Sequence, residues 1–514
     1  MIAENGRMWE KACLYDRRFL IFSLIGMVLL CGAMKATGGA GFALIFLPLL
    51  FAFGKNRTEM LLYLLLATAT LTVTNATIAP KEMIFSLSAR ALFLIVGVVM
   101  TLQLITQRAS RYYMPVLSLL LYVGYMAIVS ATGWCPMISY LKLVLFVIIF
   151  LALFSVGNAT VQRRGVDPAK LRSVFLCMAC FLIFGSMVLI PFPSISILRA
   201  ERFLELTGRL PEGGLFTGIT LHSQCLGPTI AMVSVVLLAD LLFSIRRWDK
   251  LYLLLLACTP VLIYKTGSRT AMGTWLAGLF FVLLLFMHAR GVGSKWKGRA
   301  LSALFVCGIL GGIVLFATPQ MRQQVVSFVY KARGGIVEKQ SRSFDRMIST
   351  RQGLIDSALA NFRESPVIGN GFQVSRQFQG VEISSWKQLL SAPVEKGVWV
   401  TAVLEEGGVI GMLFFLAFLL VAFYGLLSRQ VYIGASALFV FLITNLGEFT
   451  FFSVSYMGGL MWALIFTGIA LDVQRIRQAR ARRFMPWSMP PLGSVPAAAP
   501  WAPSSAPMLQ GGMR

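Results

Sequence analysis

The chain alternates between long apolar segments and short polar ones over most of its length. Fourteen of the apolar segments have about the 20 residues that a helix needs to cross the hydrocarbon core of a bilayer. They begin near Phe19, Gly39, Thr58, Met83, Met114, Met137, Val174, Gly218, Leu251, Thr270, Ala300, Gly397, Val431 and Tyr456. The pattern therefore predicts an all-α polytopic membrane protein with about 14 transmembrane helices.

The composition excludes a soluble globular domain. Of the 514 residues, 57% are hydrophobic and 13% are charged, whereas soluble domains have about 45–50% and about 25%. The eight cysteines lie mostly within apolar segments, and the Cys177/Cys180 pair has no second pair or clustered histidine beside it. We therefore predict neither a zinc site nor a disulfide framework, and no metal.

The basic residues are distributed unevenly between the two sides of the predicted membrane domain. The chain has 46 Lys and Arg against 21 Asp and Glu. The N-terminal side of the spans carries 26 of the basic residues, whereas the short loops on the opposite side carry seven. This asymmetry places both termini in the cytoplasm by the positive-inside rule, and it explains the net charge of +25 without a nucleic-acid partner.

One long polar loop separates the eleventh and twelfth spans. It carries 11 basic and six acidic residues, and this net positive charge suits an anionic ligand such as a diphosphate or an acidic glycan. Within it, residues 343–359 predict an amphipathic helix that ends at the turn residues of 366–371, and we expect this loop to fold over the outer mouth of the membrane domain. The predicted parts are a cytoplasmic N-terminus (1–18), transmembrane helices 1–11 (19–318), a large, mostly helical periplasmic loop (319–396), transmembrane helices 12–14 (397–471) and a basic, then Pro/Ala-rich, disordered cytoplasmic tail (472–514).

The ninth and tenth spans meet at a short motif with anion-binding character, 265–270. Gly267 allows a tight reversal, and Ser268 can cap the following helix. Arg269 then lies at a helix N-terminus, where unpaired amides and the helix dipole favour an anion. The alternative is an arginine that reaches the phospholipid headgroups.

Two further groups of polar residues lie at the outer ends of predicted spans. His222 and Gln224 follow a glycine-rich loop at the mouth of a helix, which indicates either a polar cavity or a hydrogen-bonded packing histidine. Glu395 and Lys396 close the large loop, as part of a site or as a surface charge pair. Glu406 belongs to a Glu-Glu-Gly-Gly motif inside an apolar stretch, which predicts a broken or re-entrant helix that faces a cavity.

Several of these segments resemble a known family. Residues 266–270 (Thr-Gly-Ser-Arg-Thr), the Arg351 helix followed by 365–372 (Ser-Pro-Val-Ile-Gly-Asn-Gly-Phe), and 406–411 (Glu-Gly-Gly-Val-Ile-Gly) are similar to the O-antigen ligase and polymerase family. The resemblance extends over roughly 208–462. It implies a polytopic glycosyltransferase that moves a glycan from a polyprenyl diphosphate to an acceptor hydroxyl, with no metal, nucleotide sugar or other cofactor.

The resemblance also implies roles for individual residues. Arg209 and Arg269 match the arginines that hold the diphosphate, while the family's loop histidine has no counterpart, because the only histidines are His222 and His288. We expect Glu395 to act as the general base, with His222 in reserve. The residues predicted to contact substrate are Arg351, Ser268, Lys396, Glu406 and Gln224.

The implied setting is the inner membrane of a bacterium, with the active site on the periplasmic face. The partners would be a polyprenyl-diphosphate-linked glycan donor, a glycan or lipid acceptor and the membrane lipids. Ligation to lipid A core, polymerisation of repeat units and protein glycosylation remain open. The competing prediction is a transporter or flippase of an anionic lipid-linked or small solute, against which the structured external loop and the lack of a visible internal repeat argue.

Overall fold

The computed structural model describes residues 15–37, 58–75, 78, 113–162, 167–196, 216–245, 249–290, 344–374, 396–453 and 456–484. Within these ranges the regular structure is helical, and the extended pairing is limited to one isolated bridge between Thr74 and Thr220. The chain divides into two units, 1–474 and 475–514, and the packing described below is that of the first.

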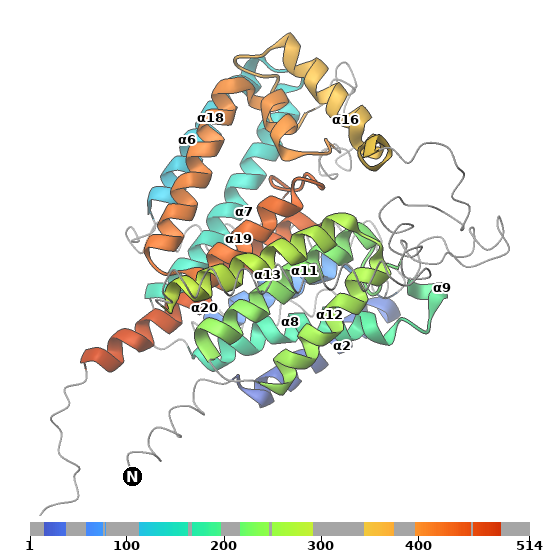
Figure 1. Ribbon diagram of the computed structural model, residues 1–514, viewed down its shortest axis with the longest axis vertical. Helices are drawn as coiled ribbons and strands as arrows, with labels where there is room; N and C mark the ends of the chain where they lie inside the picture. The colour runs from blue at the N-terminus through green and yellow to red at the C-terminus, as the bar shows by residue number, and fades with distance from the viewer. Residues whose placement is uncertain are drawn as a thin grey trace, which may run out of the picture. The chain divides into compact units, whose positions relative to one another are not determined.

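Several of the described helices are joined to the next helix by turns of two to four residues (Figure 1). In chain order they are α2 (Arg17–Thr37), α4 (Thr58–Val73), α6 (Tyr113–Thr132), α7 (Pro136–Gln162), α8 (Pro168–Val188), α9 (Pro193–Ser196), α11 (Ser223–Asp240), the π-helical turn η2 (Leu241–Ile245), α12 (Lys250–Thr266), α13 (Arg269–Ala289), α16 (Phe344–Glu364), α18 (Trp399–Ser428), α19 (Tyr432–Thr444) and α20 (Tyr456–Phe484).

Five of the described helices are long and apolar enough to cross a membrane, which indicates a membrane protein. They are Arg17–Thr37, Ala169–Val188, Ser223–Ser244, Arg269–Ala289 and Trp399–Ser428. Shorter apolar helices are Leu62–Val73, Leu117–Thr132, Pro136–Ile148, Tyr432–Thr444 and Met457–Val473. The all-helical architecture is confirmed for the described residues, but the total of about 14 spans is not, and the predicted starts at Gly39, Met83 and Ala300 lie outside those residues.

The other predicted starts fall within six residues of a helix start, and the two largest differences have local causes. α8 begins six residues before Val174, because the Asp167 carboxylate accepts the Ala169 amide (2.9 Å) and caps the helix there. α11 begins five residues after Gly218, because His222 is its cap. Caps rather than hydropathy therefore set these two boundaries.

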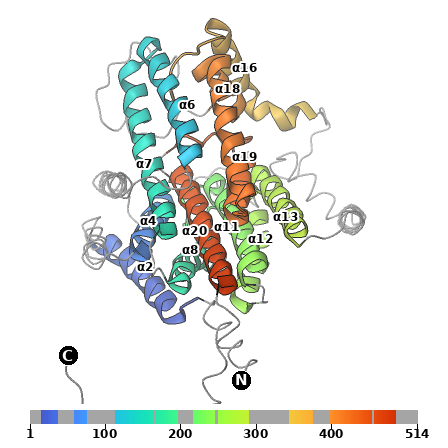
Figure 2. The ribbon, with the colours of Figure 1, turned by 90° about the vertical axis from the view of Figure 1, so that its left-hand side faces the viewer.

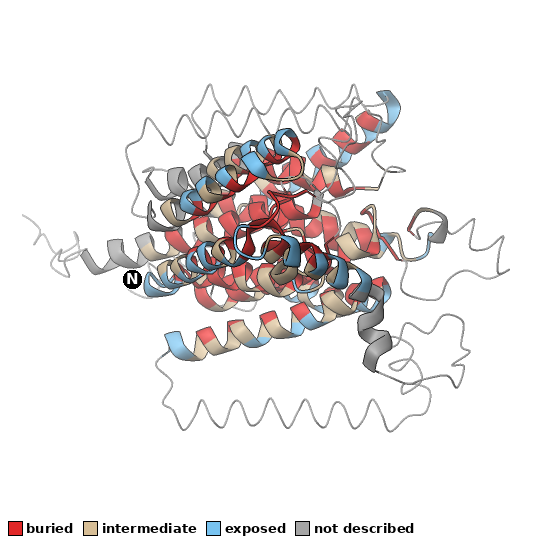
Figure 3. Cartoon of the chain, turned by 90° about the horizontal axis from the view of Figure 1, so that it is seen from above, coloured by how far each residue is buried: buried red, intermediate tan, exposed pale blue. Residues whose placement is uncertain are grey.

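α11 lies at the centre of the helix packing, in contact with α8, α12, α13 and α19. Nearly all of its side chains are buried, from Leu226 to Asp240. Figure 3 shows that buried residues fill the inside of the packing, while exposed residues lie on outward faces. Many of those exposed residues are large and apolar, such as Phe22 on α2 and Leu420 on α18, and such faces suit hydrocarbon better than water.

The described helices meet at two ends. At the first, which we call the Asp240 end, α11 finishes and α8 and α12 begin. Arg172 of α8 donates to the Asp240 carboxylate through Nε (2.7 Å) and Nη2 (3.1 Å), and the Tyr252 hydroxyl of α12 donates to the same carboxylate (2.6 Å). α2 begins at this end too, because the Ser173 hydroxyl donates to the carbonyl of Asp16 (2.9 Å).

At the second end, which we call the Lys396 end, α18 begins and α19 finishes. The Trp399 amide of α18 donates to the Asn445 carbonyl after α19 (3.0 Å). Figure 2 shows α6, α7 and α18 extending together toward this end, with α16 against α18. The predicted amphipathic helix is thus confirmed as α16, and it packs through Ala358 and, less deeply, Leu354 and Leu359.

Candidate functional site

Gly408 breaks α18 at the Glu-Glu-Gly-Gly motif. Its backbone has φ 62° and ψ −165°, which is outside the helical region. In a continuous helix, the amides of Val409 and Ile410 would donate to carbonyls four residues earlier. They donate instead to the carbonyls of Pro366 (2.9 Å) and Val367 (3.2 Å) in the loop after α16. The predicted break in this helix is confirmed.

The loop after α16 also binds the carbonyls that the break releases. The Asn370 amide donates to the carbonyls of Glu405 and Glu406 (3.1 Å to each), and the Gly371 amide donates to that of Glu406 (3.0 Å). Each of the two segments therefore supplies both donors and acceptors to the other. The amides and carbonyls that the break releases from the helix are paired with the loop. We call this pairing of residues 366–371 with residues 405–410 the interlock.

α6 holds both sides of the interlock together. The Tyr125 hydroxyl lies 3.0 Å from the Gly407 carbonyl and 3.1 Å from the Ile368 carbonyl, so its single proton is shared between the two segments. Just beyond α6, the Trp134 amide donates to the Asn370 carbonyl (3.1 Å). The loop after α16 is thereby fixed to the apolar helices by main-chain bonds as well as by packing.

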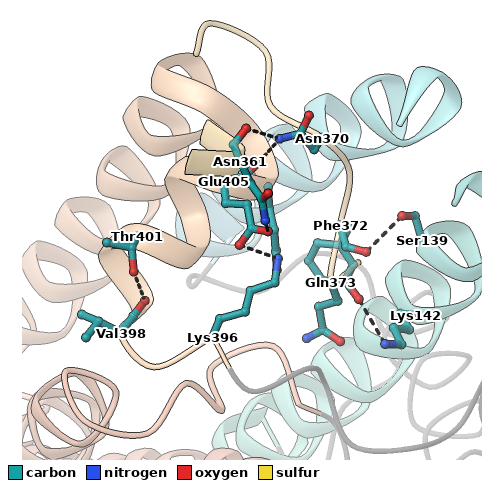
Figure 4. A network of polar contacts seen from close by, with 11 residues as sticks. Ser139, Lys142, Asn361, Asn370, Phe372, Gln373, Lys396, Val398, Thr401 and Glu405 are labelled. Atoms are coloured by element: carbon teal, nitrogen blue, oxygen red, sulfur yellow. Dashed lines mark hydrogen bonds and ion pairs between the residues drawn. The ribbon is translucent and has the colours of Figure 1, made fainter. Parts of the chain in front are cut away.

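A buried charge cluster lies against the interlock (Figure 4). The Lys396 ammonium lies 3.2 Å from Glu405 Oε2 and 3.0 Å from Glu406 Oε1, and all three side chains are less than 5% exposed. Asn361 of α16 donates to the other oxygen of Glu405 (2.8 Å). Lys396 is therefore not part of a surface charge pair, which was one of the two interpretations of the sequence.

The cluster keeps Lys396 charged. Burial by itself lowers the pKa of the Lys396 ammonium, but the carboxylates of Glu406 and Glu405 outweigh it, so the pKa is raised above its ordinary value of 10.5. A buried ion pair of this kind is strongly unfavourable to split, because removal of one partner leaves the other uncompensated in a low dielectric.

A second buried lysine approaches the same region from α7. The Lys142 ammonium donates to the Gln373 carbonyl (3.1 Å), and the Ser139 hydroxyl, one turn earlier, donates to the Phe372 carbonyl (3.0 Å). The Phe372 ring packs against Phe452, with 5.2 Å between centroids. Sequence reasoning missed Lys142, although a single lysine inside an apolar segment is itself a signal of function.

The 265–270 motif folds as predicted. Gly267 ends α12 in the left-handed conformation (φ 61°), and the Ser268 side chain accepts the Ala271 amide (3.2 Å) as the cap of α13. Arg269 is the first residue of α13, half-buried at the N-terminus of the helix. The geometry that favours an anion is present, since the first amides of a helix have no carbonyl partners within it.

α13 begins at the Lys396 end. A β-carbon on Gly447 would overlap the side chain of Thr270, so the turn after α19 lies directly against the start of α13. The same turn holds the start of α18 through the bond between Asn445 and Trp399. Arg269 and Lys396 are therefore brought to the same end of the helix packing.

His222 caps α11 next to this motif. Its Nδ1 accepts the Gln224 amide (3.1 Å), and a neutral imidazole that accepts at Nδ1 carries its proton on Nε2. Gly227, in the first turn of α11, packs against Thr266 and Ser268, which places both motifs at one end. The local geometry accounts for His222 as a helix cap, while its role as a reserve base stays a prediction.

Three of the predicted site residues are described only in part or not at all. Arg209 and Glu395 lie outside the described residues. Arg351 lies on α16, of which the backbone is described at that position. Among the described residues, no three His, Cys, Asp or Glu side chains are grouped so that they could hold a metal ion.

The comparisons with known proteins leave the chain without an assigned family. No protein-family model matches the sequence, and no curated protein matches it. The resemblance to the O-antigen ligase and polymerase family therefore depends on the motifs alone.

Proposed function

We propose that the chain is a membrane glycosyltransferase of the O-antigen ligase and polymerase type. It would transfer or polymerise glycan from a polyprenyl-diphosphate donor at the periplasmic face of a bacterial inner membrane. One observation carries the proposal: two of the segments that resemble the family, 365–372 and 406–411, form the interlock. The third, 266–270, lies at the same end of the helices.

In this proposal the acceptor hydroxyl attacks the anomeric carbon of the donor. The new carbon–oxygen bond forms as the bond to the lipid diphosphate breaks, and the proton passes to Glu395, with His222 as the reserve. Negative charge grows on the leaving diphosphate, so cations that are fixed beforehand stabilise the transition state more than the ground state. Arg269 and Arg209 would supply these cations, Arg351 a third, and a guanidinium offers paired donors to phosphate oxygens.

The Lys396 end would face the periplasm and the Asp240 end the cytoplasm. Support comes from the basic segments 163–172, 246–250 and 288–299, which all adjoin helix ends on the Asp240 side. Both termini would then lie in the cytoplasm.

A transporter or flippase of an anionic lipid-linked or small solute is the second candidate. The broken helix α18 favours it, because interrupted spans are typical of transporter binding sites. A purified protein that converts lipid-linked glycan to a longer or transferred product would decide for the enzyme, whereas translocation without a covalent change in the glycan would decide for the transporter.

The test of the transferase uses Arg269, with an exposed lysine outside the proposed site as the control. In cells that make equal amounts of each protein, Arg269→Ala should reduce glycan transfer by about 10²-fold or more, since loss of one transition-state donor costs that much. Arg269→Lys should keep part of the activity. Lys35→Ala removes an exposed charge in the last turn of α2 and should have no effect. Unchanged glycan length and transfer in Arg269→Ala would refute the proposal.

A further inference from the structure

The last helix continues beyond its apolar part into a basic segment. α20 is apolar from Met457 to Val473, and its backbone remains helical to Phe484. We call residues 475–483 the basic segment. Five of its nine residues are arginines: Arg475, Arg477, Arg480, Arg482 and Arg483. No Asp or Glu follows Asp472 in the sequence, so the segment has no acidic neighbour on its C-terminal side.

Asp472 fixes where the basic segment begins. The Asp472 carboxylate is buried and accepts the Gly434 amide (3.2 Å) in the first turn of α19. α19 starts at Tyr432, whose ring packs against Phe243 of η2 with 4.9 Å between centroids. Since η2 directly follows α11, these contacts lie at the Asp240 end. The basic segment starts there too, because it begins three residues after Asp472.

The aspartates at the Asp240 end are engaged within the protein. Asp16, Asp167 and Asp249 each accept an amide in the first turn of a helix, at 3.1, 2.9 and 2.9 Å. Asp240 itself is bound by Arg172. None of these four aspartates is exposed. The following basic residues at the same end are exposed: Arg17, Arg18, Lys250, Arg290 and Arg429. Among the described side chains, this end therefore presents cations on its surface.

The length of the basic segment matches the depth of a bilayer surface. The headgroup region of one leaflet is about 5–8 Å thick, and a helix rises about 1.5 Å per residue. On a helix perpendicular to the membrane, Arg477 would lie about 6 Å beyond Val473, within that region. Arg483 would lie about 15 Å beyond Val473, which is within roughly one Debye length of the headgroups.

We propose that the basic segment binds the headgroups of anionic phospholipids. Clusters of Lys and Arg that directly follow a membrane-spanning helix have this affinity, and a guanidinium offers paired donors to phosphate oxygens. A nucleic acid or an acidic protein would require arginines that stand clear of the bilayer, whereas the apolar part of α20 ends two residues before Arg475. The proposal goes beyond the proposed function and does not depend on glycosyl transfer.

Counting of bound lipids by native mass spectrometry tests the proposal. The full chain in a non-ionic detergent is titrated with phosphatidylglycerol or, in parallel, with phosphatidylcholine of the same acyl chains. The protein should bind phosphatidylglycerol about tenfold or more tightly, since each basic residue near an anionic surface contributes about fivefold. This preference should fall as the salt concentration is raised from about 0.1 M to about 0.5 M, because salt screens exposed charges.

The decisive variant combines Arg477→Gln, Arg480→Gln and Arg483→Gln. Glutamine forms helices about as well as arginine, so the helix should be kept while three charges are lost. The affinity for phosphatidylglycerol should fall by about tenfold or more, and that for phosphatidylcholine should not change. Lysine at the same three positions keeps the charge and should keep most of the affinity.

A matched control removes three charges elsewhere. Lys35→Gln, Lys265→Gln and Arg363→Gln are combined in one protein, and all three residues are exposed in the last turns of other helices. The net charge changes by the same amount as in the decisive variant. The preference for phosphatidylglycerol should nevertheless be retained, because the basic segment is intact.

Four results would overturn the proposal. They are equal affinity of the decisive variant and the unchanged protein for phosphatidylglycerol, an equal loss in the control, and a loss in the lysine variant as large as that in the glutamine variant. The fourth concerns a labelled oligonucleotide added to the protein in nanodiscs. Binding through the basic segment that is as strong in phosphatidylglycerol nanodiscs as in phosphatidylcholine nanodiscs would show that the lipid does not occupy these arginines.

Discussion

Gly369 and Gly408 face each other's segments across the interlock. A β-carbon on Gly369 would overlap the carbonyl of Glu406, and a β-carbon on Gly408 would overlap that of Val367. Both residues have positive φ, 80° and 62°. The two backbones therefore approach as closely as they do because both positions lack a side chain.

Alanine at either glycine should destabilise the protein. We expect Gly369→Ala and Gly408→Ala each to lower the free energy of unfolding by about 2–5 kcal/mol, from left-handed strain and overlap together. Thermal unfolding of the purified protein measures this. Gly124→Ala on α6 is the control, because nothing lies within 4 Å of its β-carbon. Equal stability of all three variants would show that the interlock does not hold.

Removal of the Lys396 charge should lower the stability of the protein, because two buried carboxylates then lack their cation. Lys396→Met leaves Glu405 and Glu406 buried without their cation and should cost about 3–5 kcal/mol of stability. Neutralising both acids in the same protein (Glu405→Gln, Glu406→Gln) should restore much of it. Lys265→Met, at an exposed lysine, is the control. A triple variant no more stable than Lys396→Met would contradict the assignment of the ion pairs.

The Arg172–Asp240 ion pair at the Asp240 end should also make the stability of the protein depend on having both partners. Arg172→Leu or Asp240→Leu alone should cost about 3–5 kcal/mol, and the double variant should cost less than the sum. Denaturation of the four proteins gives the coupling energy. Additive losses would mean that the two charges do not interact. Because this end lies away from the proposed site, glycan transfer per folded molecule should not change.

His222 can be tested as a cap separately from its role as a base. His222→Asn keeps an acceptor suited to the cap of α11, so stability should be maintained, whereas His222→Leu should cost about 0.5–2 kcal/mol. If His222 only caps the helix, His222→Asn also keeps glycan transfer. A loss of about 10²–10⁴-fold in transfer with normal stability would instead support the base.

Features that depend on local sequence could be predicted. The reversal at Gly267, the cap at Ser268 and the position of Arg269 follow from neighbouring residues, and the structure reproduces them. The break at Gly408 also has a local signal, two glycines after two acids in an apolar stretch. In these cases the conformation is decided within one helical turn.

Features that depend on distant contacts could not be predicted. Lys142 and Gln373 are 231 residues apart in sequence, and Asn361 and Glu405 are 44 apart, yet each pair is hydrogen-bonded. A sequence identifies such residues as polar but does not indicate which of them meet. For the same reason the sequence allowed two interpretations of Lys396, as part of a surface charge pair or of a site. Its burial depends on its contacts with Glu405 and Glu406 of α18, which the sequence does not indicate.

The ion pair between Arg172 and Asp240 has a consequence for biogenesis. The two residues are 68 positions apart, so α8 leaves the ribosome well before α11 does. While α11 is still being made, Arg172 can reach the lipid headgroups, because it lies near the start of α8. The fully buried carboxylate of Asp240 is the last residue of α11 and needs a cation when that helix is inserted. We therefore expect α8 to enter the bilayer first and α11 to pack against it as soon as Asp240 has been synthesised.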